Sequence, residues 1–127
     1  MKIVQGLFYS EDHEWVKVEG NKAKIGITDY AQHQMGDIVY VELPEEDDEL
    51  EAGESFGVIE SVKAASDSFS PVTGTVTAVN EDIEDDYAVL NEDPYENWIL
   101  EVELSDASEL DKLMDAQKYE AFTSEEA

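Results

Sequence analysis

Residues 55–70, SFGVIESVKAASDSFS, form two extended segments separated by a short break. Ser55 to Val62 is an apolar run of the kind found in strands, and Ser66 to Ser70 regains extended character. The intervening Lys63-Ala64-Ala65 interrupts the pattern. Two strands that meet at a short interruption predict a hairpin, and we expect Lys63 to project from its tip.

The segment before this hairpin predicts a second hairpin and a short helix. Residues 14–18 and 23–28 are apolar or alternating, and the turn-rich Glu19-Gly20-Asn21 separates them. Thr28 or Asp29 can cap a helix that continues through Met35 and ends at Gly36.

Three further strands are expected, with two acidic segments between them. The strands are residues 37–43, 74–80 and 98–104, which are rich in β-branched and aromatic residues. Residues 45–51 predict an acidic loop, and residues 81–86 predict a second acidic loop or a short helix.

A short internal repeat indicates how the strands are arranged. Gly36-x-Ile-x-x-Val41 recurs as Gly74-x-Val-x-x-Val79, with Lys63 between the two copies. The repeat would suit two similar half-sheets packed face to face. We therefore expect a mainly β protein, a flattened β-sandwich with short helices near the N-terminal third and at the C-terminus.

The C-terminal segment changes to a helical period. Leu110, Leu113 and Met114 recur at helical spacing after a possible N-cap at Ser105 or Asp106. Tyr119 and Phe122 predict a second short helical turn, and residues 124–127 a frayed tail. We expect residues 105–127 to form a helical cap and tail on a single domain of residues 1–127.

The charge balance restricts the classes of partner. The chain has 33 acidic residues against 7 basic ones, all of them Lys, and a formal net charge of −26. This charge argues against nucleic acid and against an anionic membrane surface as partners. Two interpretations stay open: attraction to partners with basic docking faces, or plain solubility and adaptation to a salty cytosol.

The chain has no Cys, which excludes disulfides, thiolate nucleophiles and Cys-based metal sites. Any redox chemistry must therefore come from a cofactor. No apolar run approaches the ~18 residues of a membrane span, and the first residues do not resemble a signal peptide. A cytoplasmic protein is the default expectation.

Lys63 is the only Lys between Lys24 and Lys112. Small residues surround it, namely Ser61, Ala64, Ala65 and Ser66. A lone, exposed amine on a rigid turn is what a modifying enzyme requires, and small neighbours leave room for it. From the residues alone, the alternative is a solvated surface lysine in an ordinary turn.

The segment ESVKAASD, Glu60 to Asp67, resembles the lipoylation motif of glycine cleavage H proteins. Other blocks are similar to the family in the same order, and together they cover about residues 6–122. These blocks are residues 10–16 (SEDHEWV), 26–32 (GITDYAQ), 36–44 (GDIVYVELP), 70–76 (SPVTGTV), 90–95 (LNEDPY) and Trp98.

The resemblance implies a lipoyl-domain fold, also described as a hybrid barrel, with lipoate joined by an amide to Lys63. It assigns the recognition motif around this lysine to Glu60, Ser61, Val62, Ala64 and Asp67. The strained dithiolane of lipoate is easily reduced and attacked.

The resemblance also implies the partners of a non-catalytic, monomeric carrier. A pyridoxal-phosphate glycine decarboxylase would load an aminomethyl group, and a tetrahydrofolate-dependent aminomethyltransferase would remove it. Dihydrolipoyl dehydrogenase would reoxidise the dithiol. A lipoate ligase, or a lipoyl or octanoyl transferase, would attach the cofactor.

Glu14 is the candidate to pair with the cationic amine of the loaded arm, and Asp67 is a weaker one. The alternative for Glu14 is a solvated strand carboxylate. The two histidines, His13 and His33, lack the spacing of a metal site, and residues 45–51 lack the Gly and spacing of a calcium loop.

The sequence departs from the family in two loops. Asn97 stands where many relatives have Gly, in a Pro94–Trp98 loop that is shorter, and Asp85-Asp86-Tyr87 lacks a common Pro. The altered Pro94–Trp98 loop favours, to a small degree, an alternative role as an H-like lipoyl donor to 2-oxoacid dehydrogenases. A biotin carrier would have Met beside the lysine, and a hydrolase would need a nucleophile motif that is not visible.

Overall fold

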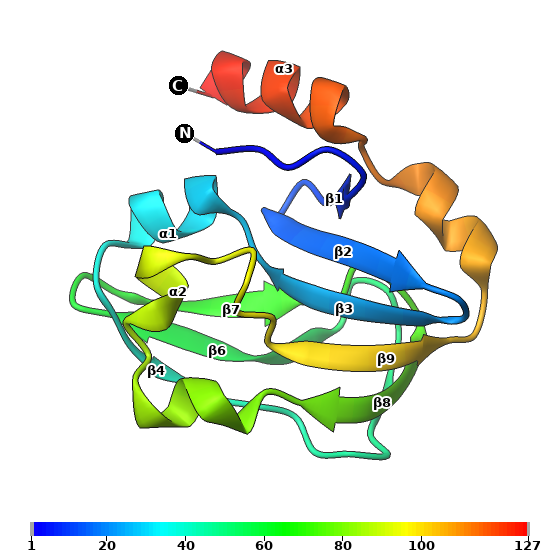
Figure 1. The fold of residues 1–127 in the computed structure, drawn as a ribbon, viewed down its shortest axis with the longest axis horizontal. Coiled ribbons are helices and arrows are strands. Elements are labelled where there is room, and N and C mark those ends of the chain that lie inside the picture. The colour runs from blue at the N-terminus through cyan, green and yellow to red at the C-terminus, as the bar shows by residue number, and fades with distance from the viewer. Residues whose placement is uncertain (1, 127) are drawn as a thin grey trace.

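The computed structural model describes residues 2–126, and strands dominate it. Two antiparallel sheets face one another, in the orders β1-β2-β3-β9-β8-β5 and β4-β6-β7 (Figure 1). The strands are β1 Phe8–Tyr9, β2 Glu14–Glu19, β3 Lys22–Ile27, β4 Ile38–Val41, β5 Glu49–Leu50, β6 Ser55–Ser61, β7 Ala65–Phe69, β8 Gly74–Val79 and β9 Leu100–Leu104. The helices are α1 Asp29–Met35, η1 Glu81–Asp85 (3₁₀), α2 Val89–Glu92, η2 Ala107–Lys112 (3₁₀) and α3 Ala116–Glu126.

The six-stranded sheet supplies most of the core. Its central strands β3 and β9 pair from Lys22↔Glu103 to Ile25↔Leu100. Alternate residues of these strands, including Ile25 and Val102, point inward and are fully buried. The three-stranded sheet contributes Ile38, Phe56 and Ile59 to the same cluster. The predicted mainly β sandwich is therefore confirmed.

The internal repeat places its two copies in opposite sheets. Residues 36–41 contain β4, and residues 74–79 form β8. Ile38 and Val76, at matching positions, are both buried in the common core. The two sheets are unequal, with six and three strands, so the expectation of two similar half-sheets is wrong in size.

Helix α1 follows the first predicted hairpin. The Thr28 hydroxyl caps it by accepting from the backbone N–H of Ala31 at 3.2 Å. Gly36 ends it with a φ of +78° and a ψ of −155°, a conformation that favours glycine. The predicted helix and both of its ends are confirmed.

The C-terminal segment differs from its predicted form. The helical spacing of Leu110, Leu113 and Met114 predicted one helix, but only the 3₁₀ helix η2 forms there. Met114 pairs with Tyr9 instead, with backbone N···O distances of 2.8 Å in both directions, and this pairing holds the chain extended. The short turn expected at Tyr119 is the longer helix α3, and it includes residues 124–126 that were predicted to fray; Ala127 lies outside the described residues.

Other observed strand boundaries differ from the predicted ones by a few residues. The strand predicted for residues 37–43 is the shorter β4, which contains a bulge between Ile38 and Tyr40. The strand predicted for 98–104 is β9, and the acidic segment 45–51 contains the two-residue strand β5. Strand β1 and helix α2 were not predicted. None of the helices formed within residues 2–126 has the length and apolar character needed to cross a membrane.

Candidate functional site

The turn between β6 and β7 is built around the hydroxyl of Ser61. This oxygen accepts hydrogen bonds from the backbone N–H groups of Lys63 and Ala64, at 3.2 and 3.3 Å. The Ser61 backbone N–H donates to the Ala64 carbonyl at 2.8 Å. The turn is therefore internally bonded, while Val62 is 66% exposed and the side chain of Lys63 is open to solvent.

The tip of this hairpin lies against the corner between α1 and β4. The Val62 backbone N–H donates to the Asp37 carbonyl at 3.0 Å. The stem of Lys63 crosses Gly36 so closely that a Cβ at Gly36 would lie 3.3 Å from the Lys63 Cε. The hairpin is thus supported by the corner, and the predicted exposed tip at Lys63 is observed.

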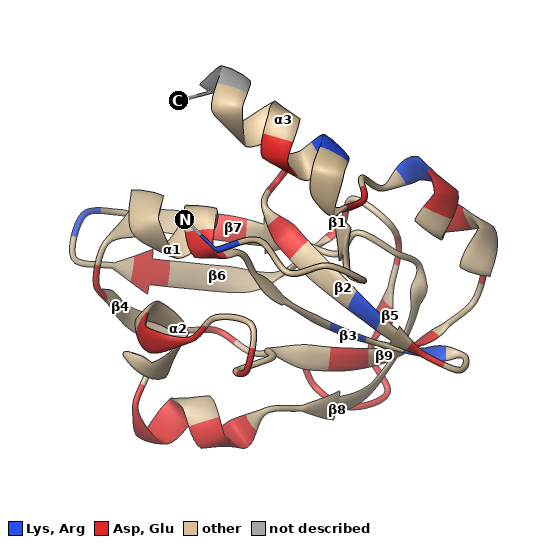
Figure 2. Cartoon of the chain, turned by 45° about the horizontal axis from the view of Figure 1, so that its top comes forward, with Lys and Arg blue, Asp and Glu red and all other residues tan. Residues whose placement is uncertain are grey.

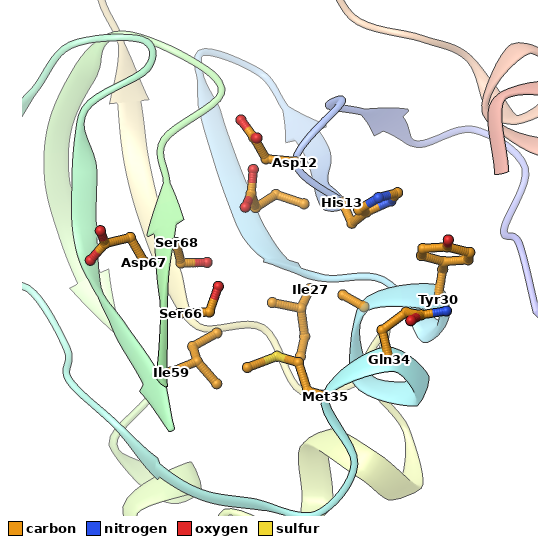
Figure 3. A pocket seen from close by; sticks show the side chains of 12 residues that line it. Asp12, His13, Ile27, Tyr30, Gln34, Met35, Ile59, Ser66, Asp67 and Ser68 are labelled. Carbon is orange, nitrogen blue, oxygen red and sulfur yellow. The ribbon is translucent and has the colours of Figure 1, made fainter. Parts of the chain in front are cut away.

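A cavity of about 190 Å³ opens beside the same corner. Helix α1 lines one side with Tyr30, Gln34 and Met35, and β7 lines another with Ser66 and Ser68 (Figure 3). Met35 directly precedes Gly36, over which the Lys63 stem runs. The Lys63 stem and the cavity are therefore linked through the consecutive residues Gly36 and Met35.

Glu14 lies in the cavity wall and is only 2% exposed. The Ser10 hydroxyl donates to its Oε1 at 2.7 Å. Burial, together with the charge of Asp12, raises the pKa of Glu14 to about 8, although hydrogen bonds from Ser10, Phe69 and Ser68 act in the opposite direction. The alternative of a solvated strand carboxylate is therefore wrong.

His13, next to Glu14, joins the cavity to the C-terminal helix. Its φ of +67° is unusual for a residue other than glycine. Its Nδ1 lies 2.8 Å from the hydroxyl of Tyr119 on α3, and its ring stacks on Tyr30 with centroids 4.4 Å apart. This turn therefore receives support from both α1 and α3.

The other predicted motif residues are distributed along the same hairpin. Glu60 lies on β6 next to its last residue, is exposed and pairs with Ala65, whereas Asp67 lies on β7 in the cavity wall. Figure 3 shows the Asp67 carboxylate on the opposite side of β7 from Ser66 and Ser68, as strand alternation requires. The carboxylate of Asp67 is therefore not aimed at the cavity from this position.

Sequence reasoning missed several residues of the site. Ser10 and Ser68 are buried and hydrogen-bond to Glu14. Neither residue was assigned a role from the sequence, although Ser10 belongs to the family-like block of residues 10–16. The Ser10–Glu14 spacing gives no signal in the sequence, because residues four apart face each other in a helix and these two flank a turn. Gly36 was assigned only to the end of a helix, and its contact with Lys63 joins segments far apart in sequence.

Acidic side chains are spread over the strands, helices and loops of the molecule (Figure 2). Within residues 2–126, no group of three or more His, Cys, Asp and Glu residues is arranged to hold a metal ion. The chain has no Lys besides Lys63 between Lys24 and Lys112, so the sheet β4-β6-β7 carries a single amine.

A family model described as Glycine cleavage H-protein matches residues 7–126 of the chain. The chain belongs to the glycine cleavage H-protein family. Its function is that of this family, the lipoyl carrier of the glycine cleavage system.

Relatives and a solved structure agree with this family assignment. The chain is 60% identical over 126 residues to the glycine cleavage system H protein of Thermoanaerobacter pseudethanolicus, covering 99% of this chain and 100% of the relative. It is 58% identical over 127 residues to that of Alkaliphilus oremlandii, with 100% of both chains covered. The crystal structure of a glycine cleavage system H protein from Mycobacterium marinum matches with a TM-score of 0.88 and 33% identity, covering 96% of this chain and 99% of that one.

Asn97, the departure from the H-protein pattern, has a structural role in its loop. Its Nδ2 donates to the carbonyls of Val89 and Asp93, at 3.2 and 2.8 Å. These bonds hold the loop against the end of α2, and they add to those from the backbone N–H groups of Asp93 and Asn97, which donate to the same two carbonyls.

Proposed function

We propose that this chain carries lipoate as an amide on Lys63. The observation that supports this proposal is the exposed Lys63 amine at a hydrogen-bonded hairpin tip, beside a cavity with a buried carboxylate. The residues fit the group: the tip leaves the Nζ accessible, and small side chains at Ala64, Ala65 and Ser66 leave space for an acylating enzyme.

The lipoyl group, when bound, supplies a dithiolane that carries the aminomethyl unit of glycine and then two electrons. The residues of this chain hold and present that group. Ser61 fixes the turn, and Gly36 supports the lysine stem. Tethering to such a tip raises the effective concentration of the arm at each docked partner.

Glu14 would hold the amine end of an aminomethyl-loaded arm, because its carboxyl lies in the cavity wall. In the empty chain its carboxyl keeps a proton around neutral pH, because burial raises its pKa to about 8. An ammonium group in the cavity favours the ionised carboxylate and binds to it by a charge-assisted hydrogen bond. The cavity wall also contains the apolar side chains of Ile27, Met35 and Ile59, which lower the polarity around this pair.

The partners follow from this carrier role. They are a pyridoxal-phosphate glycine decarboxylase, a tetrahydrofolate-dependent aminomethyltransferase, a dihydrolipoyl dehydrogenase, and a lipoate ligase or a lipoyl or octanoyl transferase. The chain works with them as a monomeric, non-catalytic carrier, and the membership in the glycine cleavage H-protein family supports this assignment.

The test is an intact-mass measurement of the chain after incubation with lipoate, ATP and a lipoate ligase. We expect the mass to increase by one lipoyl group in the wild type and to stay unchanged in Lys63→Arg. The matched control is Lys22→Arg, which replaces an exposed lysine at the turn of the other hairpin and should leave the increase intact. Acylation of Lys63→Arg, or loss of acylation in Lys22→Arg, would contradict the proposal.

A further inference from the structure

Asn91 on α2 bonds to three groups of the α1–β4 corner. Its Oδ1 accepts from the backbone N–H of Ile38 at 2.9 Å. Its Nδ2 donates to the Gly36 carbonyl at 2.8 Å and to the Gln32 Oε1 at 3.0 Å. All three hydrogen-bonding groups of the Asn91 amide are thus satisfied. The oxygen bonds to the first residue of β4, and the two N–H groups bond to α1 and to Gly36 at its C-terminal end.

The corner that Asn91 holds is the surface on which the Lys63 hairpin rests. Gly36 lies under the Lys63 stem, and Asp37, between the two backbone groups bonded by Asn91, accepts from the N–H of Val62. The exposed tip has little apolar packing of its own, because Val62 is largely solvent-accessible. The direction in which the amine projects therefore depends on where residues 36–38 lie.

Helix α2 is a firm base for this clamp. Leu90, next to Asn91, is fully buried in the main core. On the other side of the helix end, Asn97 bonds only to carbonyls of α2 and its loop. Both asparagines use their side-chain amides near α2, but Asn97 bonds within the α2 region and Asn91 bonds to the corner beneath Lys63.

We propose that Asn91 is a positioning residue for the acylation of Lys63, acting by holding residues 36–38 in the place where they support the hairpin tip. This inference rests on the proposed function, since it requires Lys63 to be the acylated residue. It also gives a role to Asn91 within the family-like block of residues 90–95, none of which lines the cavity. The side chain of Asn91 bonds to Gln32, Gly36 and Ile38 and not to Lys63, so it acts through Gly36 and Asp37.

The experiment measures steady-state acylation of the full chain by a lipoate ligase with lipoate and ATP. Removing the amide in Asn91→Ala should lower kcat/KM for the chain about tenfold, mainly in kcat, because the ligase still docks but the amine is less often aligned. The matched control, Asn97→Ala, removes two hydrogen bonds at the same helix end and should acylate like the wild type.

Hydrogen exchange supplies a readout that a general loss of stability would not reproduce. The Val62 amide should exchange faster in Asn91→Ala, while amides of the β3–β9 pair keep their wild-type protection. Asn91→Asp preserves the size and the acceptor for Ile38 but places an oxygen against the Gly36 carbonyl and Gln32 Oε1. This variant should show the same kinetic defect, and it replaces Asn91→Ala if that variant does not fold.

Equal acylation of the Asn91 and Asn97 variants, whether both are normal or both are slowed, would overturn the positioning role. So would a slow Asn91 variant whose Val62 amide exchanges at the wild-type rate. Failure of the proposed function gives a different result, because Lys63→Arg would then be acylated like the wild type.

Discussion

The two long hairpins of the molecule have the same local design but different surroundings. β2 and β3 pair from Glu14↔Ile27 to Glu19↔Lys22, and β6 and β7 pair from Ser55↔Phe69 to Glu60↔Ala65. Both hairpins carry a lysine at or beside the turn. β3 pairs with β9 on its other side and is covered on its inner face, whereas β7 is an edge strand whose first three residues are exposed.

This difference shows that the hairpin alone does not make the site. The β2–β3 turn at Gly20 has open space around it, whereas the β6–β7 turn leans on Gly36 and borders a cavity. The first hairpin is stabilised by its position within a sheet. The β6–β7 hairpin is exposed along its edge strand. The α1–β4 corner therefore determines where its lysine lies.

The largest expected difference between the hairpins is in stability. Ile25→Ala on β3 removes a fully buried side chain and should lower the free energy of unfolding by about 2–5 kcal/mol. Ser66→Ala on β7 changes an exposed side chain and should alter it by less than about 0.5 kcal/mol. The midpoints of urea unfolding measure both changes, provided that the m-value stays constant. A similar loss of stability in the two variants would contradict the division between a hairpin that stabilises the fold and one that presents the lysine.

Glu14, at the start of the β2–β3 hairpin, should give the fold a characteristic pH dependence. Its pKa in the folded chain, about 8, lies above the reference value of 4.5. Between these values the folded chain keeps a proton that the unfolded chain has released. The stabilisation is complete below pH 4.5, falls by about 1.4 kcal/mol per pH unit as the pH rises, and is lost above pH 8.

Glu14→Gln isolates this contribution, because a neutral amide does not titrate. The stability of wild type relative to Glu14→Gln should fall by about 2–3 kcal/mol between pH 5 and pH 7. Unfolding curves of both proteins at each pH give this difference, and the titration of the many exposed carboxylates largely cancels. A difference that is constant across this range would show that the Glu14 carboxyl is already ionised when buried.

The smallest expected difference in stability is between two glycines with positive φ, which acylation should distinguish instead. Gly36→Ala at the corner and Gly20→Ala in the β2–β3 turn should each cost about 1–3 kcal/mol, because both backbones favour glycine. Only the Cβ at position 36 approaches Lys63, at 3.3 Å from its Cε. Acylation by a lipoate ligase should therefore slow in Gly36→Ala and stay normal in Gly20→Ala, and equal rates in the two variants would show that the corner does not influence the lysine.

Sequence reasoning succeeded where the controlling interactions are local. The β2–β3 hairpin follows from alternation and a turn at Gly20, and α1 follows from the Thr28 cap and the Gly36 end. The exposed position of Lys63 follows from small residues where a strand is interrupted. Each of these signals lies within a few residues of the feature that it predicts.

The failures have long-range causes. The helical spacing of Leu110, Leu113 and Met114 was overridden when Met114 paired with Tyr9, more than a hundred residues earlier in the chain. The burial of Glu14 depends on packing against β7, and its strand alternation alone was compatible with solvent exposure. The clamp from Asn91 to residues 36–38 likewise joins segments that no local pattern connects.

The single amine on the three-stranded sheet has an electrostatic consequence. Acylation of Lys63 removes its positive charge, which would change the formal net charge of the chain from −26 to −27. The number is small, but the change falls on the one cation of that sheet, among exposed carboxylates such as Glu60 and Asp67. A partner with basic side chains around its entrance would thus meet a more uniformly negative surface on the loaded carrier than on the bare chain, and would associate faster with the former.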